Sequence, residues 1–157
     1  GDNTLRSAAG NPQRGRNPYM VQTTLNWATA LSDKGTALAA ADVVPVIAVP
    51  KGTMVLNAGI EVDTQTDGST FTVDLGMVDA DVFVDGFDAT SAAGVVAQNP
   101  AAYQPVMAVA DDNIDVTIAT LSGGAVSSGK FRIWAVLMDC TDMGDTAADE
   151  VDRDALA

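Results

Sequence analysis

The chain has 157 residues, enough for one domain with a hydrophobic core, and its net charge of −13 argues against nonspecific binding to nucleic acid. It contains no histidine and a single cysteine, Cys140, which excludes an intrachain disulfide, a Ser-His-Asp triad and a zinc site of the usual His and Cys type. Small and β-branched residues dominate the apolar fraction, while aromatic residues make up only 5% of the chain, and this composition favours sheet over helix.

The first 29 residues are predicted to form an extended N-terminal arm. Residues 1–18 lack apolar periodicity and are punctuated by glycine and proline, and residues 19–27 have an extended pattern. Such a segment can become ordered by lying on a neighbouring surface, although a solvated terminus is the simpler alternative. The candidate contact residues are the arginines and aromatic residues of this segment: Arg6, Arg14, Arg16, Tyr19 and Trp27.

After the arm, residues 28–41 predict one helical turn or a loop, because short isolated helices are marginal. Residues 43–49 are apolar but contain Pro45, which is typical of an edge strand. Residues 53–63 alternate with a period of two, the pattern of a long strand. One face of that strand is expected to carry its apolar residues: Met54, Leu56, Ala58, Ile60 and Val62.

The middle of the chain predicts short strands joined by turns. A hairpin connection at residues 65–69 leads to a strand at residues 70–75, with its apolar side chains on one face. A short strand follows at residues 82–84, a turn at residues 85–86, and mainly loop over residues 88–104.

Two further alternating strands complete the domain. One covers residues 114–118, after a short apolar piece at residues 106–109, and the other covers residues 131–138. The last strand carries apolar residues on both faces, which indicates a central strand or a contact surface. Because no crossover helices separate the strands, the sequence predicts an all-β antiparallel β-sandwich or jelly-roll-like domain over residues 30–140, followed by an acidic tail over residues 141–157.

No residue pattern indicates catalysis, and we expect neither an enzyme nor a cofactor. Cys140 has no histidine to activate it. A carboxylate pair for glycoside hydrolysis, or a bound cation, is an alternative reading of the aspartates in residues 63–68 and 79–88. However, the spacing does not match an EF-hand loop, and aspartate is common in turns for its own backbone hydrogen bonds, so no metal site is predicted.

Three segments occur in an order that resembles a group of tailed-bacteriophage virion structural proteins. They are residues 49–64 (VPKGTMVLNAGIEVDT), residues 70–90 (TFTVDLGMVDADVFVDGFDAT) and residues 113–139 (NIDVTIATLSGGAVSSGKFRIWAVLMD). The resemblance implies a β-sandwich protein on the virion, at the capsid surface: a decoration or cement protein that binds the major capsid protein, often as a homotrimer. The arm and the tail lie outside the resemblance.

Within the same resemblance, the second possibility is a receptor- or carbohydrate-binding module of a phage fibre or tail. Such a module needs a groove with exposed aromatic side chains, and Tyr103 and Trp134 are the candidates. For a capsid protein, the candidate capsid-binding residues are the five residues of the arm: Arg6, Arg14, Arg16, Tyr19 and Trp27.

Overall fold

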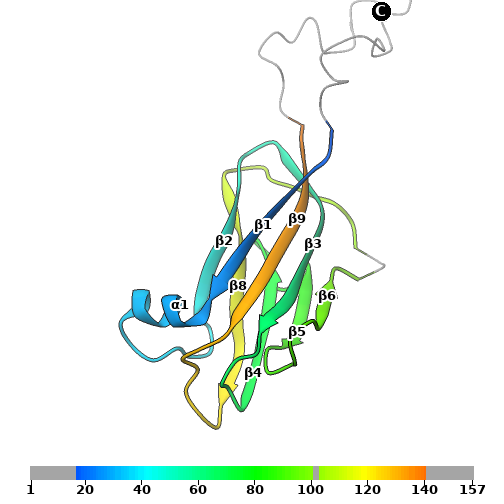
Figure 1. Ribbon diagram of the computed structural model, residues 1–157. Coiled ribbons are helices and arrows are strands. Elements are labelled where there is room, and N and C mark those ends of the chain that lie inside the picture. The colour runs from blue at the N-terminus through cyan, green and yellow to red at the C-terminus, as the bar shows by residue number, and fades with distance from the viewer. Residues whose placement is uncertain (1–16, 101–102, 141–157) are drawn as a thin grey trace, which may run out of the picture.

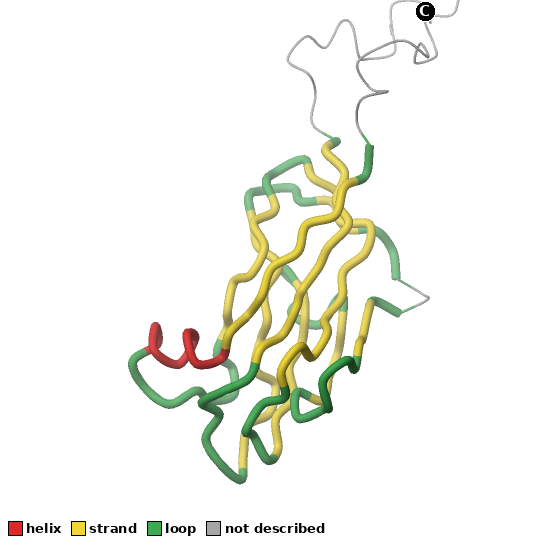
Figure 2. The backbone as a smooth tube through the Cα atoms, viewed as in Figure 1, coloured by secondary structure: helices red, strands yellow, loops and turns green. Residues whose placement is uncertain are grey.

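The computed structural model describes residues 17–100 and 103–140, which form an antiparallel β-sandwich of two sheets (Figures 1 and 2). Sheet A contains, in spatial order, β1 (Tyr19–Asn26), β9 (Lys130–Asp139), β3 (Thr53–Thr64) and β6 (Val96–Gln98), with β7 (Val106–Met107) also paired to β3. Sheet B contains, in spatial order, β2 (Val43–Val49), β8 (Asp112–Ser122), β4 (Thr70–Gly76) and β5 (Val84–Asp88). The prediction of an all-β sandwich is confirmed.

Alternation along the strands fills the core between the sheets. In β9, the residues from Phe131 to Leu137 are buried at every second position, and the strand lies between β1 and β3 as its two apolar faces predicted. The inward residues of β4 and β8 are also those that the period of two predicted. Trp27 anchors an aromatic cluster, with its ring edge-on to Phe71 at 5.0 Å and to Phe131 at 5.5 Å between centroids.

A bulge in β3 changes the face to which Met54 belongs. The pairing of β3 with β9 shifts between Val55 and Asn57, so Leu56 is the extra residue. As a result, Val55 is buried together with Ala58, whereas Met54 lies on the outer face of the sheet. The prediction that Met54 shares the core face with Ala58 is therefore wrong, because an extra residue inverts the alternation on one side of it.

The predicted arm is partly a strand of the sandwich. β1 pairs with β9 in an unbroken register from Tyr19 opposite Leu137 to Asn26 opposite Lys130. The sandwich therefore begins at Tyr19 rather than at residue 30, because residues 19–26 share backbone hydrogen bonds with the last strand. Residues 1–16 of the arm and the acidic tail over residues 141–157 lie outside the described residues.

The one helix in the described part of the chain, α1 (Trp27–Lys34), is longer than the single turn that the sequence predicted. Its first residue, Trp27, is anchored in the core. The Asn26 side chain caps its N-terminus by accepting a hydrogen bond from Ala28 N at 3.0 Å, and Gly35 ends it with a φ of 74°. None of the described residues forms a helix long and apolar enough to cross a membrane.

Two predictions for the middle of the chain are also wrong. Asp85 and Gly86 lie within β5 rather than in a turn, where Gly86 has a φ of 65° and donates its N–H to Asp74 Oδ1 at 2.7 Å. The strand predicted at residues 82–84 is wrong as well, because only Val84 of these belongs to β5. The described part of residues 88–104 is mainly loop as predicted, and it also contains β6, which pairs with β3 from Gly59 to Glu61.

Candidate functional site: an apolar sheet face

The outer faces of the two sheets differ in chemistry. The register places polar residues on the outer face of sheet B, as expected for a face that meets water: Thr72, Asp74, Asp88, Asn113, Asp115 and Thr117. The outer face of sheet A is apolar over the end at which β1 begins and β9 ends. An antiparallel sandwich needs only its inner faces to be apolar, so this second apolar face requires its own explanation.

Four methionines build this apolar area, which we call the methionine face. Met138, Met54 and Met107 are direct cross-strand neighbours on β9, β3 and β7. Beside that row, Met20 on β1 lies opposite Val136 on β9. Direct neighbours in a sheet place their Cβ atoms about 4.5–5.5 Å apart, and Val136 and Met138 lie two residues apart on the same face of β9. The five side chains therefore share one area of the outer face, which also includes the polar Asn57 opposite Val136. Met20 is 60% exposed and Met107 is 38% exposed.

Trp134 continues the methionine face along β9. Its cross-strand neighbour is Gly59, and a Cβ built on Gly59 would lie 2.1 Å from Trp134 Cζ2. The indole ring therefore lies over the backbone of β3, in the space that any other residue at position 59 would fill. This packing fixes a broad apolar ring on the outer surface of sheet A.

An ionic cluster bounds the apolar area at its other end. The Arg132 guanidinium lies 3.1 Å from Glu61 Oε2 and 3.6 Å from Asp63 Oδ1. These half-exposed pairs contribute little to stability, but they mark where the outer face of sheet A becomes polar.

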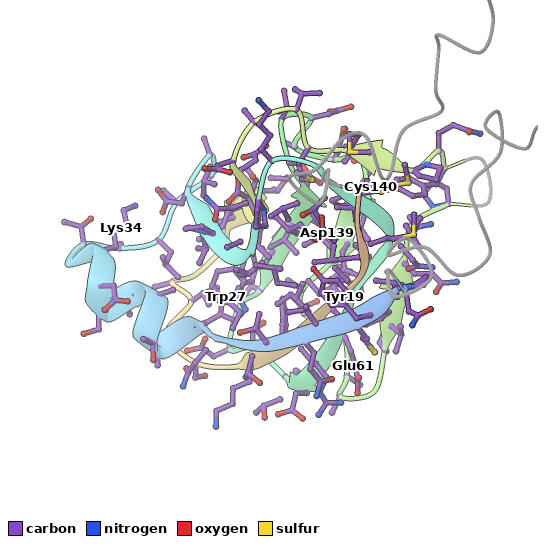
Figure 3. The ribbon with its side chains drawn as sticks, turned by 90° about the horizontal axis from the view of Figure 1, so that it is seen from above. Tyr19, Trp27, Lys34, Glu61, Asp139 and Cys140 are labelled. Carbon is purple, nitrogen blue, oxygen red and sulfur yellow. The ribbon has the colours of Figure 1, made fainter. Side chains whose placement is uncertain are left out.

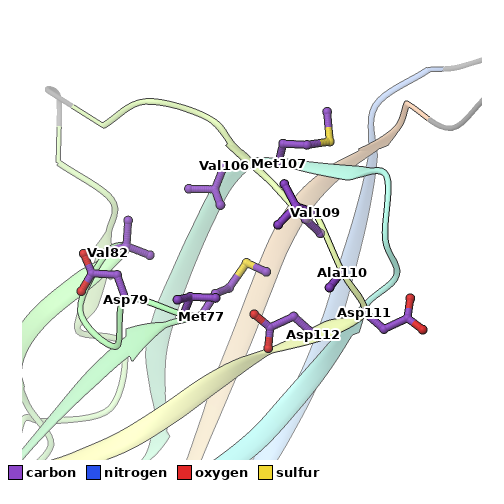
Figure 4. Close-up of a pocket in the computed structure, with 11 residues that line it drawn as sticks. Met77, Asp79, Val82, Val106, Met107, Val109, Ala110, Asp111 and Asp112 are labelled. Atoms are coloured by element: carbon purple, nitrogen blue, oxygen red, sulfur yellow. The ribbon is translucent and has the colours of Figure 1, made fainter.

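A groove adjoins the methionine face at the same end of the sandwich (Figure 4). It has a volume of ≈ 440 Å³ and is lined by residues 77–79, by Val82 and by residues 106–112. Met107 belongs to both surfaces, and two strongly exposed valines, Val78 at 94% and Val109 at 81%, stand at the groove. Exposed apolar side chains beside a groove are typical of a contact surface.

Two carboxyl groups near the groove, those of Asp79 and Asp115, have raised pKa values. A hydrogen bond and the like charge of Asp81 raise the pKa of Asp79, and both residues are exposed in the β4–β5 connection. Burial, followed by the charge of Asp112, raises the pKa of Asp115. No group of three or more acidic or cysteine residues that could hold a metal ion occurs within residues 17–100 and 103–140.

The structure separates the residues that the sequence proposed for contact. Tyr19 is 45% exposed at the start of β1, close to the end of β9, whereas Trp27 lies at the other end of β1 and is fully buried (Figure 3). Trp27 is therefore a core residue, and its indole is unavailable to a partner of the folded domain. Arg6, Arg14 and Arg16 lie outside the described residues.

The two aromatic residues considered for carbohydrate binding do not share a surface. Tyr103 packs against the buried Phe83, with ring centroids 5.6 Å apart, and its hydroxyl donates to Val55 O at 2.6 Å. Trp134 instead covers Gly59 on the outer face of sheet A. The two rings therefore do not form the platform on which a sugar would stack.

Sequence reasoning missed most of the methionine face because its residues are far apart in the chain. The strand order and the β3 bulge place Met20, Met54 and Met107 on the same outer face of sheet A. One signal was available: the last strand carries Trp134, Val136 and Met138 at alternate positions opposite its core residues.

No protein-family model and no curated protein matches the sequence. Among solved structures, the fold is similar to a chain in the capsid of Ralstonia phage GP4, with a TM-score of 0.58 and 15% identity over 88% of this chain and 92% of that chain. It is also similar to a chain in the acidic stable capsid structure of Helicobacter pylori bacteriophage KHP30, with a TM-score of 0.55 and 13% identity over 80% of this chain and 91% of that chain. At these identities the likeness establishes a β-sandwich fold shared with chains of two phage capsids.

Proposed function

We propose that this protein is a structural protein of a bacteriophage capsid, a decoration or cement protein that binds and stabilises the shell of the major capsid protein. The observation that carries the proposal is the fold shared with chains from two phage capsids, over 92% and 91% of their lengths. Because the match spans nearly all of each chain, the likeness is to short proteins of similar size, and not to one domain of a much longer subunit. We accordingly propose the capsid surface of the virion as its location.

The methionine face is the proposed contact with the shell. Soluble monomers rarely expose a continuous apolar patch unless it binds something. Methionine is flexible and polarisable, so a patch of methionines can adapt to the shape of a partner surface. The net charge of −13 keeps free copies apart in solution, while the patch itself carries no charge that would have to be desolvated on binding.

Two parts of the proposal extend beyond the described residues or a single copy. The arginines at positions 6, 14 and 16 are proposed to contact the shell from the N-terminal arm, which leaves the sandwich beside Tyr19 at the edge of the methionine face. Homotrimers are proposed to form only on the shell, where contacts with the shell subunits offset the repulsion between copies. Density for residues 1–16 on shell subunits, and threefold clustering of copies, would be the corresponding observations in a particle reconstruction.

The experiment that tests the proposal measures cosedimentation of the purified protein with shells that lack it. Replacing both exposed methionines, Met20→Glu with Met107→Glu, places two carboxylates on the contact. Desolvating them is expected to weaken binding by about 100-fold or more. Since both side chains are exposed, the domain should remain folded by circular dichroism.

A control variant with the same added charge shows whether the position of the substitutions or the charge alone weakens binding. The pair Thr120→Glu with Ser122→Glu lies at exposed positions of β8, in sheet B, and should bind shells as well as the unmodified protein. Equal binding by the methionine variant and this control would exclude the methionine face as the contact. If the unmodified protein did not bind shells at all, the proposed function itself would be wrong.

A further inference from the structure

The sandwich protects its strand edges unequally. β2 contains Pro45 and a register shift next to it, β5 has five residues interrupted by Gly86 with positive φ, and β6 and β7 have three and two residues. Proline, bulges and short length are the usual means by which proteins prevent an edge from pairing with another chain. β1, the remaining edge, has eight residues, no charge, no proline and no register shift.

The direction of the free backbone groups of β1 follows from its register. Trp27 N donates to Gly129 O at 3.0 Å, which continues the β1–β9 register by one pair and marks it as a hydrogen-bonded pair. Such pairs alternate along an antiparallel ladder. The N–H and C=O groups of the even-numbered residues, Met20, Gln22 and Thr24, therefore point away from β9. Within the described chain β1 pairs with no other strand, so these six groups face outward.

The same three residues connect the edge to the methionine face. Residues opposite one another in a sheet share a face, so Met20, Gln22 and Thr24 lie on the outer face with Val136 and Trp134. A strand added beside β1 would pair with about five residues and extend the methionine face by one strand. Its residue next to Met20 would have to be apolar to continue that surface.

We infer that the outer edge of β1 binds an extended strand of the shell subunit, which becomes an additional strand of sheet A. This inference rests on the proposed function. The occupant is a partner strand without acidic residues, apolar where it meets Met20. A second copy of this chain is disfavoured because each copy carries a charge of −13, and an uncharged edge offers nothing to offset that repulsion.

Hydrogen exchange read residue by residue tests the inference. In the free protein, the amides of Met20, Gln22 and Thr24 should exchange fast, and those of Val21, Thr23 and Leu25 should be protected by β9. The protein is then incubated in D₂O while bound to shells, released, and read by NMR. The three outward amides should now exchange about tenfold or more slowly, because each acquires a hydrogen-bond acceptor.

A pair of variants at one position provides an independent test. Gln22→Pro removes an outward N–H but none of the N–H groups that bond to β9, and proline is tolerated on an edge strand when its nitrogen faces outward. It should weaken shell binding about tenfold, while Gln22→Ala, which keeps the backbone donor, should bind within about twofold of the unmodified protein. The melting temperature of each variant checks that the domain remains folded.

Different results separate this inference from the proposed function. Shell binding with outward amides that still exchange at the free rate would overturn the strand addition and leave capsid binding intact. Slowed exchange in the purified protein that grows with its own concentration would identify a second copy as the occupant and would also overturn the inference. Failure to bind shells under any condition would overturn the proposed function.

Discussion

Gly59 lies under the ring of Trp134 on the outer face of sheet A, and the substitution Gly59→Ala tests this packing. The added Cβ would lie 2.1 Å from Trp134 Cζ2, so the indole must move away from the sheet. Overpacking of this kind is expected to lower the free energy of unfolding by about 1–3 kcal/mol, measured by urea denaturation. In the double variant with Trp134→Ala the alanine should cost much less, since no ring remains to clash. Equal costs in both backgrounds would mean that the ring does not occupy this space.

The carboxylate of Asp67 joins two connections that are distant in sequence. It accepts hydrogen bonds from Ser127 N at 2.8 Å, from Ser128 N at 3.0 Å and from the Ser127 hydroxyl. These bonds, led by the Ser127 hydroxyl, lower the pKa of Asp67 from 3.8 to about 2. This also explains one of the aspartates that the sequence left open as a cation ligand: it holds the β8–β9 loop against the β3–β4 turn.

This shift predicts that Asp67 stabilises the fold at neutral pH and that this contribution disappears at low pH. The folded pKa lies below the unfolded one, so the stabilisation is complete above pH 3.8 and is lost as the pH falls towards 2. Asp67→Asn should therefore flatten the dependence of the melting temperature on pH in that window. Ser127→Ala, which removes the leading hydrogen bond to the same carboxylate, should flatten the slope in part. Identical slopes for Asp67→Asn and the unmodified protein would contradict this assignment.

At the scale of elements, β6 is short, and Asn99 extends its pairing with β3. The Asn99 side chain accepts a hydrogen bond from Ala58 N at 2.9 Å, and its backbone N–H donates to Ala58 O at 3.1 Å. Asn99→Ala leaves Ala58 N–H without its partner, and the expected loss is about 1–2 kcal/mol of unfolding free energy. The amide of Ala58 should then exchange faster with solvent. Asn99→Asp retains the acceptor, so an equal loss in that variant would show that the hydrogen bond is not the cause.

The sequence predicted the strands whose alternation is uninterrupted. β4, β9 and residues 114–118 of β8 keep a period of two, so their core residues could be read directly. β3 could not be read this way, because Met54 and Val55 are both apolar and the extra residue, Leu56, is visible only in the pairing with β9. The bulge thus hides one member of the methionine face from any reading of the sequence alone.

Long-range pairing limited the prediction for the N-terminal region in the same way. Tyr19 pairs with Leu137, more than a hundred residues away, and no local pattern reports such a contact. The sequence predicts that Trp27 belongs to the arm, because residues 19–27 have an extended pattern after the glycine- and proline-rich residues 1–18. Its burial against Phe71 and Phe131 depends on strands that come much later in the chain.

At the scale of the whole molecule, the two outer faces of the sandwich differ in chemistry. Sheet B presents aspartates to water, and sheet A presents the methionine face and an unprotected strand edge at the end where β1 begins and β9 ends. The net charge of −13 opposes self-association of free copies in solution, and the uncharged face and edge are the surfaces that remain for binding a partner. Because of this asymmetry, we expect the protein to bind a capsid in a single orientation.

Under the proposed function, a cryo-EM reconstruction of phage particles that contain this chain tests the central claim most directly. We predict one sandwich at regular positions on the shell, with the methionine face and the β1 edge against the major capsid protein and the aspartates of sheet B facing solvent. Particles without this density, or a sandwich attached through sheet B with the methionines exposed to water, would contradict it.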